Sequence, residues 1–446
     1  MRRQQSPPLT EGPVTRHLVR LTLPMIMGML SMTIFHLTDT YFIGQLGKNE
    51  LAAISFTFPV IMVLNSIALG LGVGASSVIS RTIGEGNSMK VRRLATDALF
   101  LAVIIVAFVV AAGELTIYPL FRLLGAPEDI LPLTAAYMRI WYIGVVFVVV
   151  PMTGNHIIRA TGDMKTPGLI MTAAALVNMV LDPIFIFGFG PFPGMGIAGG
   201  AIATVIGRAM SMVIALAVII FREKLITLDR VPFREVLSSW KKILFVGIPA
   251  ALSNLIIPVT MGVITRLVAS FGTSAVAGFG VATRLEMLVM LVIRALASVM
   301  IPFSGQNWGA GLLDRVKTAL KSSYIIAAVW SLVLFAFLFI FGKPVVSLFN
   351  KDPQIVETAV LYLRIVAASY SFQGILLVSV ASLNALNKPI HSILISLFHA
   401  AGLYVPLALA GTALWGLKGI FIAAFAANTI AGIGAALTAF RQTNHV

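Results

Sequence analysis

Hydrophobic residues run through this chain in long unbroken stretches, separated by short polar segments rich in glycine, proline and charge. A stretch of about twenty apolar residues crosses the roughly 30 Å hydrocarbon core of a membrane as an α-helix. The pattern predicts an all-α integral membrane protein with twelve spans, at residues 18–44, 51–80, 93–118, 133–158, 167–189, 197–221, 243–271, 277–308, 319–341, 359–386, 389–414 and 419–440.

Composition and charge agree with a membrane protein. The chain is 58% hydrophobic and 11% charged, whereas soluble domains are about 25% charged. Its net charge of +15 does not indicate nucleic-acid binding, because Lys and Arg lie in the gaps between apolar runs rather than on one solvated face. About 21 of them fall in alternate gaps and about 5 in the others. We therefore expect a multi-pass protein of the inner or plasma membrane with both termini in the cytoplasm.

The chain contains an internal repeat with a shift of about 225 residues. Pro24 then falls on Pro249, and Gly84 on Gly309. Parallel repeats of this kind are an architecture of membrane carriers. The repeat predicts a cytoplasmic N-terminal segment at 1–17, an N-lobe of six helices at 18–221, a cytoplasmic linker at 222–242, a C-lobe of six helices at 243–440 and a tail at 441–446, the two lobes being related by a pseudo-two-fold axis.

Two carboxylates interrupt the apolar runs of the first half. Asp39 lies in MTIFHLTDTYFIG and Asp182 in LVNMVLDPIFIFG, each shortly before the outer end of its span. Asn178 precedes Asp182 by one helical turn, and Thr204 lies at a similar depth in the next span. Carboxylates inside a membrane are expensive and usually functional. We expect these four oxygen-bearing side chains to form one site, which either binds Na⁺ or holds a proton between two like charges.

The repeat shows that only one half carries this pair. Asp39 aligns with Ile264 and, after a two-residue slip near residue 165, Asp182 aligns with Val405. A role in ion coupling explains why both acids occur in the same half and at the same depth. The alternative is that each Asp is capped separately by hydroxyl or backbone groups and is merely tolerated.

The second half has a polar group of its own. Glu286 and Arg284 lie in its second span, with Arg294 further along, and Arg266 lies near the end of the span before it. Opposite charges inside a membrane usually pair, which favours a structural pair between Glu286 and an arginine. The alternative is that Glu286 is a second proton-linked carboxylate. His36 likewise either tunes the protonation of Asp39 or is a packed helix residue.

No motif indicates an enzyme. The chain lacks cysteine, and it lacks GxxxxGK[ST], HExxH and GxSxG. Without a nucleotide-binding loop, transport energy comes from an ion gradient, so we expect no cofactor beyond a coupling ion, H⁺ or Na⁺. The alternatives are a flippase for lipids or lipid-linked sugars, with a cavity rich in Arg and Lys, then an intramembrane enzyme and a channel.

Several longer segments together resemble one transporter family. LTLPMIMGMLSMTIFHLTDTYFIGQLG, GASSVISRTIGEG, RATGDMKTP, NMVLDPIFIFGFG and, in the second half, VAGFGVATRLE and SGQNWGAG are similar to the multidrug and toxic compound extrusion (MATE) family, on its DinF-type side. The resemblance implies a V-shaped protein of two six-helix lobes. It implies export of drugs or toxic organic cations in exchange for H⁺ or Na⁺. For partners beyond these small molecules we expect membrane lipids, no nucleic acid and a monomeric protein.

The resemblance also implies roles for individual residues. Coupling falls on Asp39 and Asp182, with Asn178 and Thr204 as their companions, and a bend of the first helix falls on Pro24. Two pocket positions fall on Asn155 and Tyr137. The chain departs from the pattern in having Phe35 where a tyrosine is expected. It also lacks the seventh-helix acid of the other main branch, which favours coupling in the N-lobe.

Overall fold

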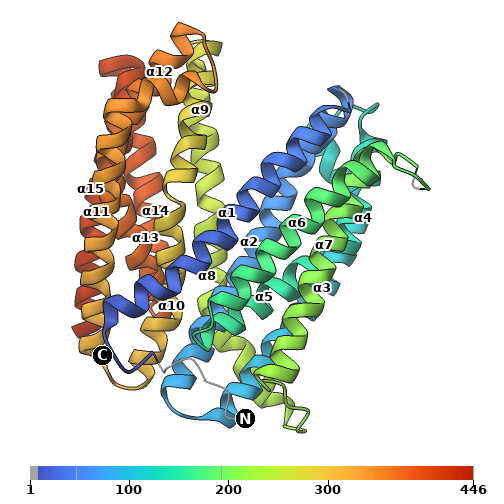
Figure 1. Ribbon diagram of the computed structural model, residues 1–446, viewed down its shortest axis with the longest axis vertical. Helices are drawn as coiled ribbons and strands as arrows, with labels where there is room; N and C mark the ends of the chain where they lie inside the picture. Colours follow the sequence, from blue (N-terminus) through green and yellow to red (C-terminus); the bar gives the residue numbers. More distant parts are fainter. Residues whose placement is uncertain (1–8, 47, 192, 445–446) are drawn as a thin grey trace. The chain divides into compact units, whose positions relative to one another are not determined.

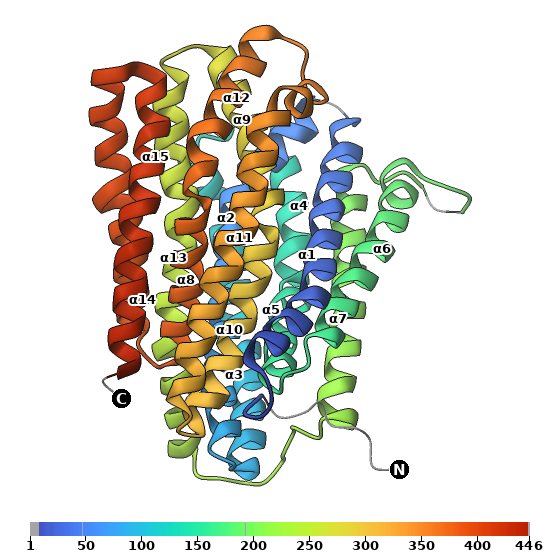
Figure 2. The ribbon, with the colours of Figure 1, turned by 60° about the vertical axis from the view of Figure 1, so that its left-hand side comes forward.

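The computed structural model describes residues 9–46, 48–191 and 193–444 (Figure 1; Figure 2). Residues 1–8 of the predicted N-terminal segment and residues 445–446 of the predicted tail lie outside the described residues. Within those ranges the chain is all-α and contains no β-strand. The predicted fold class is therefore confirmed.

The helices of the first half follow the predicted apolar runs. The fourth run is divided at Val145 into two helices, and the sixth ends in a π-helical turn. The elements are α1 (Val14–Gly44), α2 (Lys48–Gly84), α3 (Ser88–Leu123), α4 (Leu131–Gly144), α5 (Val146–Ala160), α6 (Lys165–Phe187), α7 (Ile197–Ala217) and η1 (Val218–Arg222).

The helices of the second half repeat this order with more interruptions. The elements are α8 (Phe233–Ala269), α9 (Thr273–Val289), α10 (Leu291–Gly309), α11 (Leu313–Ser347), α12 (Pro353–Val366), η2 (Ala367–Ser369), α13 (Tyr370–Ala385), α14 (Pro389–Leu397), η3 (Phe398–Tyr404) and α15 (Val405–Asn444). α9 and α10 meet at a 45° bend at Met290, and together they are long and apolar enough for one span.

The number of membrane-spanning segments agrees with the twelve predicted runs. Ten described segments are long and apolar enough to cross a membrane, and the bent pair α9–α10 adds an eleventh. The last of the ten, Pro389–Asn444, has non-helical backbone at Trp415 and Gly416. Because that break falls between the predicted runs 389–414 and 419–440, the segment contains two of them.

The ends of the helices preserve the internal repeat. Shifted by about 225 residues, the ends of α2, Lys48 and Gly84, coincide with Thr273 and Gly309, the first residue of α9 and the last of α10. The first half uses one continuous helix where the second uses a bent pair. The two halves therefore share a plan but differ in local geometry.

The chain packs into two compact units. One is Leu23–Ala251, and the other combines the stretch that ends at Thr22 with the stretch that begins at Leu252. The unit boundaries therefore lie inside α1 and α8, close to Pro24 and Pro249, which are equivalent in the repeat. We call the first the N-unit and the second the C-unit. The lobe boundaries drawn from the sequence remain a prediction.

Small residues pack the first half of α8 against α2 within the N-unit. A Cβ atom added to Gly70 would lie 2.5 Å from the backbone oxygen of Gly247, and one added to Gly74 would lie 2.3 Å from that of Ile243. Contacts under 3 Å are not tolerated, so glycine is required at this crossing. Such small-residue crossings are a common way to pack helices in membranes.

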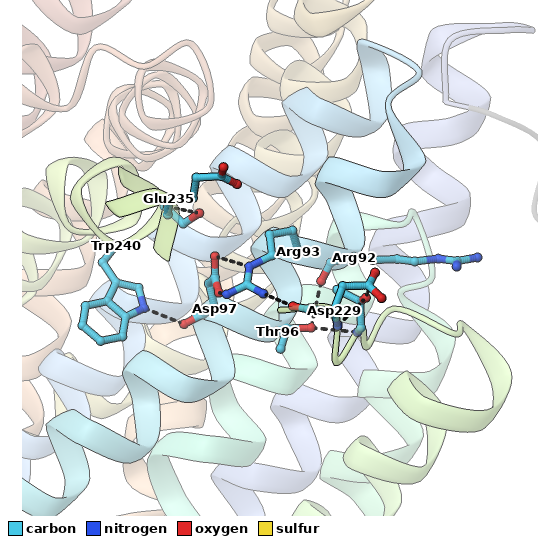
Figure 3. A network of polar contacts seen from close by, with 9 residues as sticks. Arg92, Arg93, Thr96, Asp97, Asp229, Glu235 and Trp240 are labelled. Carbon is cyan, nitrogen blue, oxygen red and sulfur yellow. Dashed lines mark hydrogen bonds and ion pairs between the residues drawn. The ribbon is translucent and has the colours of Figure 1, made fainter. Parts of the chain in front are cut away.

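The predicted linker is held against α3 (Figure 3). Arg93 forms an ion pair with Asp97 and donates a hydrogen bond to the backbone oxygen of Asp229. The backbone N–H of Thr227 donates to the Thr96 hydroxyl at 3.0 Å, and the indole N–H of Trp240 donates to the Asp97 backbone oxygen at 3.0 Å. α8 begins at Phe233, so the second half of the predicted linker is helical.

Candidate functional site

The site in the N-unit depends on a close crossing of α1 and α6. A Cβ atom added to Gly168 would lie 2.5 Å from the backbone oxygen of Pro24, and one added to Gly28 would lie 2.9 Å from the Cα atom of Gly168. One turn further along, the Ser31 hydroxyl donates to the Thr172 hydroxyl at 3.1 Å. These backbone contacts bring α1, which carries Asp39, against α6, which carries Asp182.

The two predicted carboxylates are enclosed and interact electrostatically. Asp182 is fully buried, and neither of its carboxylate oxygens has a hydrogen-bond partner among the described residues. The Oδ1 atom of Asp39 is also buried without a partner. A buried carboxylate without a donor is strongly destabilised in its charged form. The pair is therefore poised to take up a proton or another cation.

The two predicted companions lie beside one another. The side-chain amide of Asn178 donates to the Thr204 hydroxyl at 3.3 Å, joining α6 to α7. In this orientation the Oδ1 atom of Asn178 has no partner among the described residues. The site thus presents hydrogen-bond acceptors from Asp39, Asp182 and Asn178, without matching donors.

A small cavity lies next to Asn178 and Thr204. It has room for about one water molecule. α1 contributes Met32 and Phe35 to its wall, and α7 contributes Arg208. Phe35 is buried, so the position where a tyrosine is expected presents an apolar ring to this cavity.

Two further predicted residues, Tyr137 and His36, differ in whether they interact with the carboxylates. Tyr137 in α4 is buried, interacts electrostatically with both Asp39 and Asp182, and accepts a hydrogen bond from the Trp141 indole at 3.0 Å. His36 is exposed on the N-unit and its ring lies against that of Phe35. Tyr137 therefore belongs to the surroundings of the acids, while His36 lies at their edge.

Asn155 lies in a different environment. It is buried in α5, and its Oδ1 atom has no described partner. The next residue, His156, packs against α2, where a Cβ atom added to Gly72 would lie 2.4 Å from the ring. No described hydrogen bond connects Asn155 to Asp39 or Asp182, so its part in a substrate pathway remains a prediction.

In the C-unit, neutral donors hold the carboxylate of Glu286. The Tyr362 hydroxyl donates to one oxygen and the Gln373 side-chain amide donates to the other at 3.2 Å. No described ion pair joins Glu286 to an arginine, and Arg266 and Arg284 are both exposed. The carboxylate is therefore bound by neutral side chains of α12 and α13, and it interacts electrostatically with Arg294 without a described ion pair.

Arg208 is a site residue that the sequence analysis missed. It lies one turn after Thr204 on α7 and lines the same cavity. The signal was present in the sequence, because an arginine inside a membrane helix is as exceptional as an aspartate. It therefore adds a basic side chain to the cavity wall beside Asn178 and Thr204.

The donor set suits a proton or a hard cation. Carboxylate, amide and hydroxyl oxygens are the ligands that hard metal ions prefer. The described residues contain no group of three or more His, Cys, Asp or Glu side chains that could hold a metal ion. A site built from two carboxylates, one amide oxygen and one hydroxyl is compatible with a monovalent cation.

Comparison with known proteins identifies the family. The family model MatE matches the chain twice, at residues 24–184 and 249–410. The chain belongs to the MATE family. The two matches correspond to the two halves of the internal repeat, so this MATE protein is a membrane transporter built from a duplicated unit.

Three relatives resemble it over nearly their whole length. An FAD transporter of Shewanella oneidensis is 40% identical, covering 95% of this chain and 94% of that protein. The multidrug export protein MepA of Staphylococcus aureus is 26% identical, covering 96% and 94%. The crystal structure of the Vibrio cholerae MATE transporter VcmN in the bent form has a TM-score of 0.91 and 30% identity, covering 97% of each chain.

Proposed function

We propose that this MATE transporter is a secondary antiporter that exports amphipathic compounds in exchange for H⁺ or Na⁺. The observation that supports the proposal is the group of buried acceptors without donors: both oxygens of Asp182, one oxygen of Asp39 and one of Asn178. Two ionised carboxylates in this environment repel each other and are poorly solvated. A proton or Na⁺ relieves both penalties.

Exchange follows because the coupling ion and a cationic substrate compete for the same two carboxylates. With Asp39 and Asp182 ionised, the site favours a cationic substrate. When H⁺ or Na⁺ neutralises the pair, the substrate is released and the equilibrium between the two access states shifts. Gly168 of α6 lies in close contact with Pro24 of α1. A movement of α6 when Asp182 is neutralised is therefore transmitted to α1.

For substrates, the first candidates are aromatic or amphipathic compounds, often cationic, since a relative is named a multidrug export protein. A second candidate is FAD, because the relative with 40% identity is named an FAD transporter. FAD is an amphipathic anion with a pyrophosphate group. It therefore needs positively charged binding groups, whereas a cationic drug needs carboxylates.

Everted membrane vesicles test the coupling, with a pH gradient and a Na⁺ gradient imposed separately and ethidium and FAD as substrates. We expect Asp39→Asn and Asp182→Asn to abolish exchange of both substrates while the protein remains folded. The exposed aspartate Asp129 provides a matched control, and Asp129→Asn should exchange like the wild type. Normal efflux by Asp39→Asn would refute the assignment.

A substitution at Glu286 tests whether ion coupling depends on the C-unit as well as on the N-unit. Glu286→Gln retains the hydrogen-bonding shape but removes the charge of the C-unit carboxylate. We expect this variant to exchange ethidium for the same ion as the wild type. Loss of ion dependence in Glu286→Gln, with Asp182→Asn active, would move the coupling to the C-unit.

A further inference from the structure

Two exposed arginines lie on the bent span α9–α10 of the C-unit. Arg284 belongs to α9, and Arg294 belongs to α10 near the middle of the span Thr273–Gly309. A guanidinium in the middle of a membrane is costly against acyl chains, so such residues face protein or water. Because Arg294 is exposed on its unit, this face of α9–α10 is hydrated.

Neither arginine has a described ion-pair partner. Neither Arg284 nor Arg294 takes part in an ion pair or donates a hydrogen bond among the described residues. Other arginines of the chain have partners: Arg93 pairs with Asp97, Arg222 with Asp163, and Arg315 donates to backbone oxygens. The donors of Arg284 and Arg294 are therefore available to a ligand.

The carboxylate of Glu286 is held by other donors. Glu286 interacts electrostatically with Arg294, but its two oxygens accept hydrogen bonds from Tyr362 and Gln373. Those donors hold the carboxylate toward α12 and α13. Glu286 is thus a positioning residue next to the arginines, without an ion pair to either.

Apolar side chains are also exposed between the two arginines. Met287 and Leu288, which lie between the arginines along the span, are 48% and 38% exposed. Methionine side chains adapt to flat, polarisable ring systems. Guanidinium groups bind phosphate oxygens through paired hydrogen bonds. A ligand with both a ring system and a phosphate matches this combination.

We propose that this face of the C-unit recognises the pyrophosphate of an amphipathic dinucleotide, with Arg294 and Arg284 as the binding residues. The inference rests on the proposed export function and assigns part of the substrate to residues outside the carboxylate site. Under this inference the two repeats have different roles. The N-unit binds the coupling ion, and the C-unit selects phosphate-bearing substrates.

Binding to the purified protein, in neutral detergent, tests the inference with three probes. FAD carries the pyrophosphate, riboflavin has the same ring system without phosphate, and ethidium is a cation. We expect Arg294→Gln and Arg284→Gln each to weaken FAD binding about tenfold, with riboflavin and ethidium binding unchanged. Arg294→Lys should lie between, because lysine retains the charge but lacks the paired donors.

Arg364 provides the matched control. It is an exposed arginine of the same unit, and its guanidinium lies over the ring of Phe339 at 5.4 Å. Arg364→Gln should bind all three probes like the wild type. If Arg294→Gln weakened binding of all three probes equally, the inference would be overturned. Failure of the wild-type protein to bind FAD would overturn it as well.

Two further outcomes separate the inference from its alternatives. If Arg294→Gln loses affinity only in vesicles containing phosphatidylglycerol, the arginines bind lipid headgroups and the inference is wrong. If FAD binding depends on Arg294 but no ion gradient drives efflux, the phosphate site stands and the proposed exchange fails. If exchange depends on Asp39 while FAD binding ignores both arginines, the proposed function stands and the phosphate site fails.

Discussion

At the scale of single residues, the proposed coupling rests on buried polar atoms without described partners. In the N-unit, Asp182 is fully buried with no described donor to either oxygen, and Arg208 lines the cavity beside Asn178. Asn178 and Thr204, which precede Asp182 and Arg208 by one turn on α6 and α7, line that same cavity.

Removal of the Arg208 charge should favour cationic ligands. We expect Arg208→Gln to bind ethidium about threefold or more tightly than the wild type, because a like charge is removed one turn from Thr204 of the proposed coupling site. Arg139, which lies 3.9 Å from Glu114 near the surface, is the control, and Arg139→Gln should leave ethidium affinity unchanged. Fluorescence titration of purified protein measures both. Equal or weaker ethidium binding by Arg208→Gln would contradict this role.

At the scale of elements, glycines and loop contacts decide how the helices meet. Gly168 allows α6 to approach the backbone of α1 at Pro24, and this approach sets where Asp39 lies relative to Asp182. The RATGDMKTP motif supports the start of α6. There Asp163 accepts hydrogen bonds from the backbone and hydroxyl of Thr166 at 2.9 and 2.5 Å, and forms an ion pair with Arg222.

A larger side chain at Gly168 should separate α1 from α6. Gly168→Leu forces the backbones apart, which costs about 1–3 kcal/mol in well-packed sites and displaces Asp39 from Asp182. We expect a lower thermal unfolding temperature and lost exchange activity. Gly262, where an added Cβ meets no atom within 4 Å, is the control, and Gly262→Ala should retain activity. An active Gly168→Leu protein would show that the crossing is not needed.

The Asp163 contacts should make stability depend on pH. Burial alone would raise the pKa of Asp163, but the Thr166 hydrogen bonds and the Arg222 guanidinium outweigh it and hold the pKa below its ordinary value. The stabilisation is present above about pH 4, the ordinary range of aspartate, and is lost as pH falls through the folded-state pKa. Thermal unfolding at a series of pH values should show Asp163→Asn less stable than wild type at pH 7. The difference should shrink under acid, and a constant difference would contradict the assignment.

At the scale of the whole molecule, one plan is used twice with different chemistry. The family model matches both halves, and the ends of α2 recur at the ends of α9–α10. The paired acids nevertheless occur only in the first half, whereas the second half has Glu286 and exposed arginines. Duplication thus provides two similar scaffolds, and substitution within each provides different binding properties.

The distribution of basic residues predicts the orientation of the whole chain. Because the chain has no cysteine, single cysteines can report sidedness with a membrane-impermeant thiol reagent. Leu228 in the linker is 91% exposed, and Asp129 lies in an exposed loop between α3 and α4. We expect Leu228→Cys to be labelled only from the cytoplasmic side and Asp129→Cys only from outside. The reverse labelling would invert the topology.

The sequence by itself determined the fold class, the spans and the duplication. Hydrophobic runs of membrane length, a repeat shift of about 225 residues and family motifs are local or periodic properties, so they are readable without coordinates. It also identified Asp39 and Asp182, because a charge in an apolar run is conspicuous wherever the helices lie.

Only the tertiary structure decided which of these residues have partners. The hydrogen bonds from Tyr362 and Gln373 to Glu286, the contact between Gly168 and Pro24, and the place of Arg208 beside Asn178 all join segments far apart in the chain. Spacing along one helix does not encode the rotation and approach of another. Packing sets those, and packing therefore decides which buried groups are satisfied and which are left to bind an ion or a substrate.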